Sequence, residues 1–333
     1  MTYRPAFDIR LEGRPIADEL STRLIDLTLT DKRGLEADQL DLTISDHDGR
    51  VVIPSRGVVL TCAIGWQSQG EPELVDKGRF IVDEVEHSGA PDKLIIRARS
   101  ADFREGFKTQ KERSWHQQTL GQIVNTLAKE NQLTANIESS LSNTAISHID
   151  QTNESDANFL TRLAKQHDAI ITVKNGQLLV LPIGNGKTIN KTIPTMTLTR
   201  QDGDKHRFTI ADRESTFSGV KAKWHDTNSA KTRVVIIGEN DNLKTLRQTY
   251  SSESTARKEA EAEWKRLQRA KQQMELTLAH GNPELFPQMP VKLEGWKASI
   301  DEVQWQLWEV VHSINGSGFV SRVRLEVANN ATV

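Results

Sequence analysis

The sequence predicts a mainly β protein with an α+β insert, in which two small antiparallel β-barrels flank a middle unit of two helices and a hairpin. Apolar and polar residues alternate through the first and last thirds of the chain, which is the period of a strand with one buried face. Turn residues interrupt these stretches at short spacing. Between them the apolar period becomes that of a helix.

Composition excludes several classes of protein. At 333 residues, the chain is long enough for two or three separate cores. Its 43 lysines and arginines against 45 acidic residues give a net charge of -2, too weak a field to recruit nucleic acid or an anionic membrane. The single cysteine, Cys62, excludes an intrachain disulfide and lies in an alternating apolar run, so we expect a buried, inert thiol. The sequence contains no run of eighteen apolar residues, so it predicts no membrane helix.

The first barrel is expected over residues 1–105. Alternating apolar residues begin at Phe7 and recur in four further stretches, the last of which ends at Ala98. Short turn signals separate them, among them Asp48-Gly49. Such short strands with close turns are typical of an antiparallel barrel or sandwich.

The middle unit is expected over residues 106–185. Thr119 and Gln122 form a capping box for a first helix, and Ser155 is the predicted N-cap of a second. Asn175-Gly176 lies between two apolar runs, where a type I′ turn would connect a hairpin. A unit of this size is compatible with a plain structural insert or with a LysM-like module, and both interpretations stay open.

Residues 186–333 are expected to form a linker and the second barrel, with a long helix inserted at about 252–273. The helix has only a thin apolar stripe, which suits packing across a barrel or on a neighbouring subunit. Its cations Lys265, Arg266 and Arg269 alternate with glutamates. This mixture favours a solvated face over a nucleic-acid site.

Three tryptophans are candidate interface residues. In the strand from 305 to 314, the apolar parity changes near Leu307, which predicts a bulge or burial of both faces at a domain or subunit contact. Trp305 and Trp308 lie on either side of this change, and Trp264 lies on the thin stripe of the long helix. We therefore expect these residues to contribute to assembly.

The sequence nominates no catalytic, metal-binding or cofactor-binding residue. Its nine histidines occur singly, without the spacing of a metal motif, and no second cysteine accompanies Cys62. A Gly-x-Ser-x-Gly nucleophile elbow is absent from the sequence. We expect neither an enzyme nor a cofactor.

Several motifs together resemble one protein family. They are Gln151-x-x-Glu-Ser-Asp-x-x-Phe-Leu-x-Arg-Leu-Ala164, Phe80-Ile-Val-Asp-Glu-Val85, Ser114-Trp115, Gly281-Asn-Pro-Glu-Leu-Phe-Pro287, Trp308-Glu-Val-Val-His312 and Gly318-Phe319. The set is similar to the phage late control D, or baseplate hub, family of contractile-tailed phages, which is related to the hub part of type VI secretion spike proteins. The resemblance spans nearly the whole chain.

This resemblance implies a structural role in the virion tail baseplate, or in a tail-like particle, after synthesis in the host cytoplasm. The expected assembly is a homotrimer that joins the hexameric tail tube protein to the trimeric central spike protein, contacts other baseplate proteins and lets DNA pass through a channel. No needle repeat follows the second barrel, so the spike is expected to be a separate polypeptide. The alternatives are a tail-tip protein that binds peptidoglycan through a LysM-like unit, or one that degrades peptidoglycan.

Charge is distributed unevenly along the chain. Residues 1–105 hold 14 lysines and arginines against 20 acidic residues, a net of -6, whereas the remainder has 29 against 25, a net of +4. We expect the acidic first part to contribute to the channel wall, because a channel that bound phosphates tightly would hold DNA back. Specific nucleic-acid binding is not expected.

Overall fold

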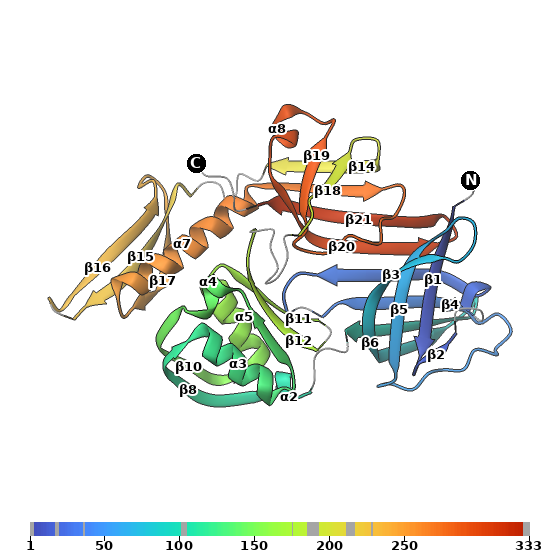
Figure 1. The fold of residues 1–333 in the computed structure, drawn as a ribbon, viewed down its shortest axis with the longest axis horizontal. Coiled ribbons are helices and arrows are strands. Elements are labelled where there is room, and N and C mark those ends of the chain that lie inside the picture. The colour runs from blue at the N-terminus through green and yellow to red at the C-terminus, as the bar shows by residue number, and fades with distance from the viewer. Residues whose placement is uncertain are drawn as a thin grey trace.

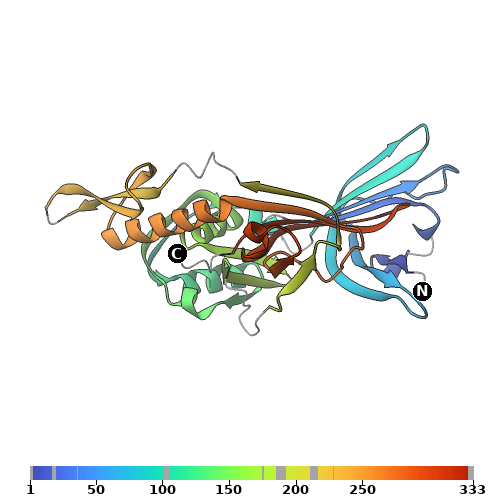
Figure 2. The same cartoon turned by 90° about the horizontal axis from the view of Figure 1, so that it is seen from above.

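The fold is mainly β, as the sequence predicts. A computed structural model describes residues 3–16, 20–35, 37–100, 105–174, 176–184, 193–210, 217–227 and 229–328. Strands outnumber helices throughout these ranges. Figures 1 and 2 show an elongated molecule with a large twisted sheet, a middle unit beneath it and an insert projecting at one end. Residues 185–192, which hold the start of the predicted linker, lie outside the described ranges.

The first β half is an antiparallel array in the order β3-β4-β7-β6-β5-β1-β2. Its strands are β1 (Arg4–Leu11), β2 (Arg14–Pro15), β3 (Leu24–Lys32), β4 (Gln39–Ser45), β5 (Val59–Gln67), β6 (Glu73–Ser88) and β7 (Lys93–Ser100). The predicted alternation is confirmed, because Leu27 and Leu29 of β3 and Leu40, Leu42 and Ile44 of β4 enter one core. Cys62 is buried in that core, and burial raises the pKa of its thiol to about 12.

The second β half surrounds another core, in the order β14-β18-β21-β20 with β19 and β13 at one side. Its elements are β13 (Met196–Thr199), β14 (Gly203–Ile210), β18 (Gln272–Leu278), β19 (Pro290–Glu294), the short helix α8 (Ala298–Asp301), β20 (Trp305–Asn315) and β21 (Gly318–Val327). The ladder of β20 and β21 shifts register between Leu307 and Glu309. This confirms the bulge that the change of parity predicts.

The two β halves share one sheet, so two separate closed barrels are not confirmed. Strand β20 pairs antiparallel with β3, from Glu309 opposite Lys32 to Asn315 opposite Asp26. Within the described residues this makes a 13-stranded sheet whose main path ends at β14 and β2. Alternation alone did not predict the join, because it specifies which face of a strand is buried and not which strand lies beside it.

The middle unit encloses a third core, from Phe107 to Val180. Its elements are α2 (Glu105–Lys108), β8 (Gln110–Thr119), α3 (Leu120–Glu130), β9 (Thr134–Ile137), α4 (Ser139–Ser142), β10 (Ala145–Ser155), α5 (Asp156–Gln166), β11 (Ala169–Lys174) and β12 (Gln177–Pro182). The capping box at Thr119 and the N-cap at Ser155 are both present. The predicted hairpin is β11 and β12, with Gly176 at φ +71°, and Asn175 lies outside the described ranges. The β8–β10 pair was not predicted.

The insert between β14 and β18 folds around its own core, contrary to the expectation that its strands complete the second barrel. Strands β15 (Gly219–Asp226), β16 (Lys231–Gly238) and β17 (Leu243–Tyr250) form a three-stranded sheet, and α7 (Glu253–Ala270) lies across it. Figure 1 shows this insert extending away from the large sheet. None of the helices in the described ranges is long and apolar enough to cross a membrane.

Candidate assembly interface

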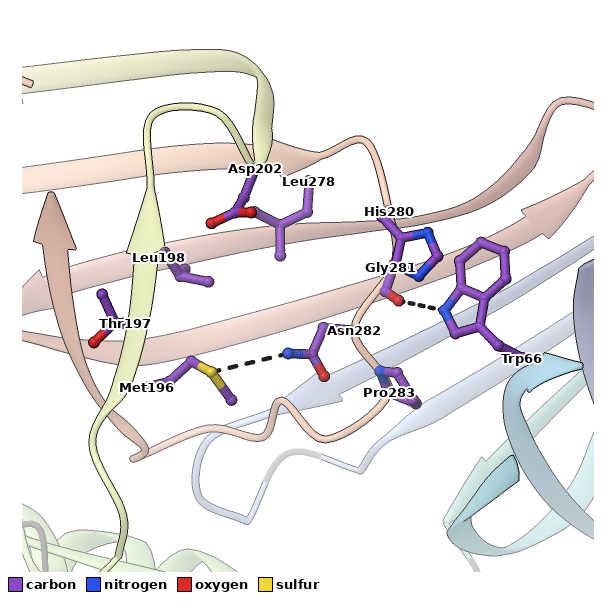
Figure 3. Close-up of a pocket in the computed structure, with 10 residues that line it drawn as sticks. All are labelled: Trp66, Met196, Thr197, Leu198, Asp202, Leu278, His280, Gly281, Asn282 and Pro283. Atoms are coloured by element: carbon purple, nitrogen blue, oxygen red, sulfur yellow. Dashed lines mark hydrogen bonds between the residues drawn. The ribbon is translucent and has the colours of Figure 1, made fainter. Parts of the chain in front are cut away.

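The join between the β halves is fixed by an aromatic contact at Trp66 of β5. The indole ring of Trp66 stacks on the imidazole of His280, with ring centroids 3.8 Å apart and planes 7° apart. Its Nε1–H donates to the carbonyl oxygen of Gly281 at 2.7 Å. Figure 3 shows His280 and Gly281 on the segment that leaves β18, facing Trp66 from the other half. Sequence reasoning missed Trp66, because only the tertiary fold places it beside residues more than 200 positions away.

Gly281 lies too close to Phe319 for any side chain. The Gly281 N–H donates to the Phe319 carbonyl oxygen at 2.8 Å. A Cβ atom at position 281 would lie well inside the van der Waals contact distance of Phe319 Cδ2. The Phe319 ring is itself held in the core of the first half, 5.3 Å from the centroid of Trp66. Glycine is therefore required for this approach of the two segments.

The segment after Gly281 is attached to both halves by hydrogen bonds. Ser321 Oγ accepts the Asn282 N–H at 3.0 Å and lies 2.8 Å from His312 Nδ1. Burial lowers the pKa of His312 to about 3, so its imidazole is neutral and Nδ1 can accept the Ser321 proton. From the first half, Lys77 Nζ donates to the Leu285 carbonyl oxygen at 3.3 Å. These bonds hold the segment from Gly281 to Leu285 between β6 and β21, and we call this segment the clamp.

A hollow of about 350 Å³ opens beside the clamp. Figure 3 shows Met196, Asp202 and Asn282 around it, with the Asn282 amide directed at the Met196 sulfur. The Asp202 carboxylate accepts from the Thr199 amide at 2.7 Å and from the Thr199 hydroxyl at 2.8 Å. Asp202 therefore closes a turn.

An ion cluster of Arg33, Asp168, Arg269 and Glu326 joins the two β halves, the middle unit and the insert. Arg269 of α7 donates from Nη1 to Asp168 Oδ2 at 2.9 Å, and the two side chains are 4 % and 9 % exposed. Arg33 pairs with Glu326, whose Oε1 is also 3.9 Å from Arg269 Nε. Arg269 is therefore not on the solvated face of the helix, where the sequence placed it.

The three predicted tryptophans are not brought together. Trp305 is 1 % exposed in the core of the second half, where its Nε1–H donates to the Ile300 carbonyl oxygen at 2.9 Å. Trp264 is half-buried in the core of the insert, with Lys271 Nζ 5.5 Å from its ring centroid. Trp308, on the bulge, is 39 % exposed beneath the guanidinium of Arg324. Of the three, Trp308 has the most surface open to a partner.

A cleft of about 1380 Å³ separates the middle unit from the insert. Strand β10 and helix α5 line one side, and the end of β17 and the first turns of α7 line the other. Burial, with a smaller contribution from Glu263, raises the pKa of Glu259 in this cleft to about 7. Burial also lowers the pKa of His167, in the same direction as the nearby charge of Lys258.

Comparison with known proteins identifies the architecture. Residues 33–318 match the family described as the phage tail baseplate hub. The chain belongs to the phage tail baseplate hub family. Two probable baseplate hub proteins, from Escherichia phages 186 and P2, are 44 % and 41 % identical to this hub chain. The alignments cover 97 % and 98 % of this chain, and 93 % and 94 % of theirs.

Solved structures share the fold of this hub chain. The 43 kDa tail protein of prophage MuSo2 from Shewanella oneidensis has a TM-score of 0.71 at 16 % identity, covering 98 % of this chain and 99 % of that one. A tail protein from Neisseria meningitidis MC58 has a TM-score of 0.71 at 15 % identity, covering 98 % and 97 %. An Escherichia coli component of the type VI secretion system has a TM-score of 0.56 at 12 % identity, covering 92 % and 73 %. The family match and the two relatives from phages 186 and P2 confirm the family resemblance of the sequence.

Several residues of the motifs that carried the resemblance gather at two places in the hub chain. Gly281, His312 and Phe319 meet at the clamp. The motif from Gln151 to Ala164 surrounds the start of α5. There the buried Asp156 accepts from Gln151 Nε2 at 2.9 Å and from Lys111 Nζ at 2.6 Å. Both sets of contacts stabilise the fold. The chain is thus a baseplate hub of a contractile phage tail, and the family is a structural one.

Proposed function

We propose that this hub chain acts as a homotrimeric adaptor, which joins the hexameric tail tube to the trimeric central spike in the virion baseplate. The observation that carries the proposal is the edge-to-edge join of two β halves through β3 and β20, each with a core of its own. Three chains then supply six comparable, barrel-like units to a sixfold ring, while the rest of each chain keeps threefold contacts. The chain would be made in the host cytoplasm before assembly with other baseplate proteins.

Trp308 is the proposed contact residue of the adaptor, with Trp264 and Trp305 in supporting roles. A half-exposed indole beside the cations and carboxylates of β20 and β21 has the character of an interface anchor. Trp305 supports the bulge from the core, and Trp264 stabilises the insert. We also propose that residues 1–105, 106–185 and 186–333 act as separate assembly units, with the clamp setting the angle between the first and the last.

The acidic first β half is the proposed contributor to the DNA channel. Its net charge of -6 contrasts with +4 for the remainder. A negative wall repels the phosphate backbone, so a genome passes without being held. The slightly basic remainder is then directed at protein partners.

The mass of the assembled protein tests the adaptor proposal. Native mass spectrometry of the purified chain, alone and with tail tube protein, should show a species of three times 37.4 kDa. Cryo-electron microscopy of the tail should place the two β halves alternately around one ring. A dimer, or a ring in which only one half faces the tube, would contradict the proposal.

A second candidate function rests on the cleft between the middle unit and the insert. Its lining is rich in neutral hydrogen-bonding side chains, among them Gln118, Asn153, Gln166 and Thr249, which suit a glycan. Binding to purified peptidoglycan in a sedimentation assay would support this LysM-like role. Release of soluble fragments from the same substrate would support degradation instead.

A further inference from the structure

Strand pairing in the middle unit places two histidines side by side, although the sequence shows them 32 positions apart. His116 of β8 and His148 of β10 are direct cross-strand partners. Both side chains lie on the exposed face of this two-stranded sheet, opposite the core side that Trp115 occupies. The sequence contained no signal for this pair, because the register of β8 and β10 was unknown.

The distance between the two imidazoles suits a shared metal ion. His116 Nδ1 and His148 Nδ1 are 3.1 Å apart, and the rings stack with centroids 4.5 Å apart at 26°. At a metal–nitrogen distance of about 2.0–2.1 Å, two ligating nitrogens are separated by about 2.9 Å at a right angle and by about 3.4 Å at the tetrahedral angle. The observed separation lies between these values.

A carboxylate orients one of the two rings. Asp150 Oδ2 lies 3.2 Å from His148 Nε2, and Asp150 Oδ1 accepts the Ser114 hydroxyl at 2.6 Å. The Ser114 hydroxyl occupies Oδ1, so Oδ2 of the same carboxylate is left to accept the Nε2–H of His148. That tautomer leaves a lone pair on His148 Nδ1, directed to the His116 side. A histidine held by a carboxylate on its far nitrogen is the usual arrangement around a bound metal.

We propose that His116 and His148 form a two-imidazole site for a divalent transition-metal ion, with Asp150 as its positioning residue. Among the described residues, no group of three or more histidine, cysteine or carboxylate side chains is placed to hold a metal. The remaining coordination positions therefore belong to water or to a partner group that enters the cleft lined by His148. Two imidazoles favour Cu²⁺ over Ni²⁺ and Zn²⁺.

Titration of the full-length chain, purified without a histidine tag, with Cu²⁺ tests the site. We expect one equivalent to bind, with an electron paramagnetic resonance spectrum that shows coupling to two nitrogens. His116→Ala and His148→Ala should each weaken binding at least tenfold, and His116→Gln serves as a second variant if the alanine change disturbs the β8–β10 pair. Asp150→Asn should weaken binding by about tenfold, the lower end of the effect of such orienting groups.

The exposed His225 of the insert provides a matched control, because His225→Ala removes an imidazole outside the pair and should leave the titration unchanged. Thermal melting of each variant confirms that the middle unit stays folded. One-equivalent binding that survives the double change His116→Ala and His148→Ala would place the metal elsewhere and overturn the proposal. Failure of the unaltered chain to bind Cu²⁺ would overturn it as well.

Discussion

Asp168 and Arg269 form a buried ion pair, although 101 positions separate them in the chain. Asp168 follows the helix α5 of the middle unit, and Arg269 lies in the last turn of α7 in the insert. Arg33 and Glu326 complete the cluster, so two cations and two anions balance inside the molecule. The position of the middle unit relative to the large sheet thus depends on the presence of all four charged side chains.

Removal of one ion from this cluster should be more harmful than removal of a pair. Arg269→Ala leaves Asp168 buried without its guanidinium partner and should cost about 3–5 kcal/mol of stability. The double change Arg269→Met and Asp168→Leu leaves Arg33 and Glu326 balanced and should restore much of that loss. Thermal and urea unfolding of the two variants and the unaltered protein measure the difference, and a double change that costs as much stability as Arg269→Ala would contradict the coupling.

Gly281→Ala should loosen the join between the two β halves. The added methyl would lie well inside the van der Waals contact distance of the Phe319 ring, and overpacking of this kind costs about 1–3 kcal/mol. Gly316→Ala is a matched control, since a Cβ there would have no neighbour within 4 Å. Melting temperature, together with quenching of Trp66 fluorescence, reports the change. If Gly281→Ala and Gly316→Ala have the same melting temperature, the Phe319 ring moves aside without loss of stability and the expectation is wrong.

Trp305→Ala and Trp308→Ala should separate folding from assembly. Trp305 is 1 % exposed, and its truncation should cost about 3–5 kcal/mol, so the variant melts early. Trp308 is 39 % exposed, and its truncation should change melting little while lowering the yield of trimer or particle. The two assays together decide the role of Trp308, because unchanged melting with unchanged yield removes it from the interface.

Glu259 should make stability depend on pH. Burial, aided by Glu263 and opposed by Lys165 and Arg162, raises its pKa in the folded protein to about 7 from the ordinary value of 4.5. The folded state therefore holds the proton more tightly, and this stabilisation is present below pH 4.5 and lost as pH rises through 7. Glu259→Gln has no carboxyl group to ionise at this position, so it does not lose this stability. The variant should therefore gain stability relative to the unaltered protein as pH rises.

The size of this gain should be of the order of 1 kcal/mol above pH 7, because the partly accessible carboxylate is screened by solvent. Melting curves between pH 5 and pH 8 measure it. Glu261→Gln, an exposed position on the same helix, is the control. A constant difference between Glu259→Gln and the unaltered protein across this range would refute the assignment.

Duplex DNA should not bind to the purified chain. Of the cations of α7 that the sequence singled out, Lys265 and Arg266 are accessible to solvent, and Arg266 pairs with Glu263. The third, Arg269, is buried. Sequence-independent binding needs several clustered cations and weakens steeply with salt. A gel-shift assay at about 150 mM salt, a physiological ionic strength, should show no complex. A shift abolished by Lys265→Gln and Arg266→Gln would reverse this expectation.

Local patterns predicted local structure well. The capping box at Thr119, the N-cap at Ser155, the long helix and the bulge near Leu307 each depend on residues within a few positions of one another. Hydrogen bonds and periodicity at that range can be read directly from the order of residues.

Long-range pairing was not predictable in the same way. The β3–β20 ladder, the stacking of Trp66 on His280 and the meeting of His116 with His148 all depend on register and tertiary placement. A single sequence contains the alternation of each strand but not the identity of its neighbour. The insert shows the same limit, because β15 and β16 have the pattern of barrel strands and instead form a small sheet under α7.

The β3–β20 ladder also imposes an order on synthesis. One partner, Leu24–Lys32, leaves the ribosome long before the other, Trp305–Asn315, because the middle unit and the insert are translated between them. Until then β3 presents an open edge, and open edges of nascent chains pair readily with wrong partners. A nascent or prematurely terminated chain therefore lacks the second β half beside β3, and only a chain that has been translated through β20 can close the edge and enter a baseplate.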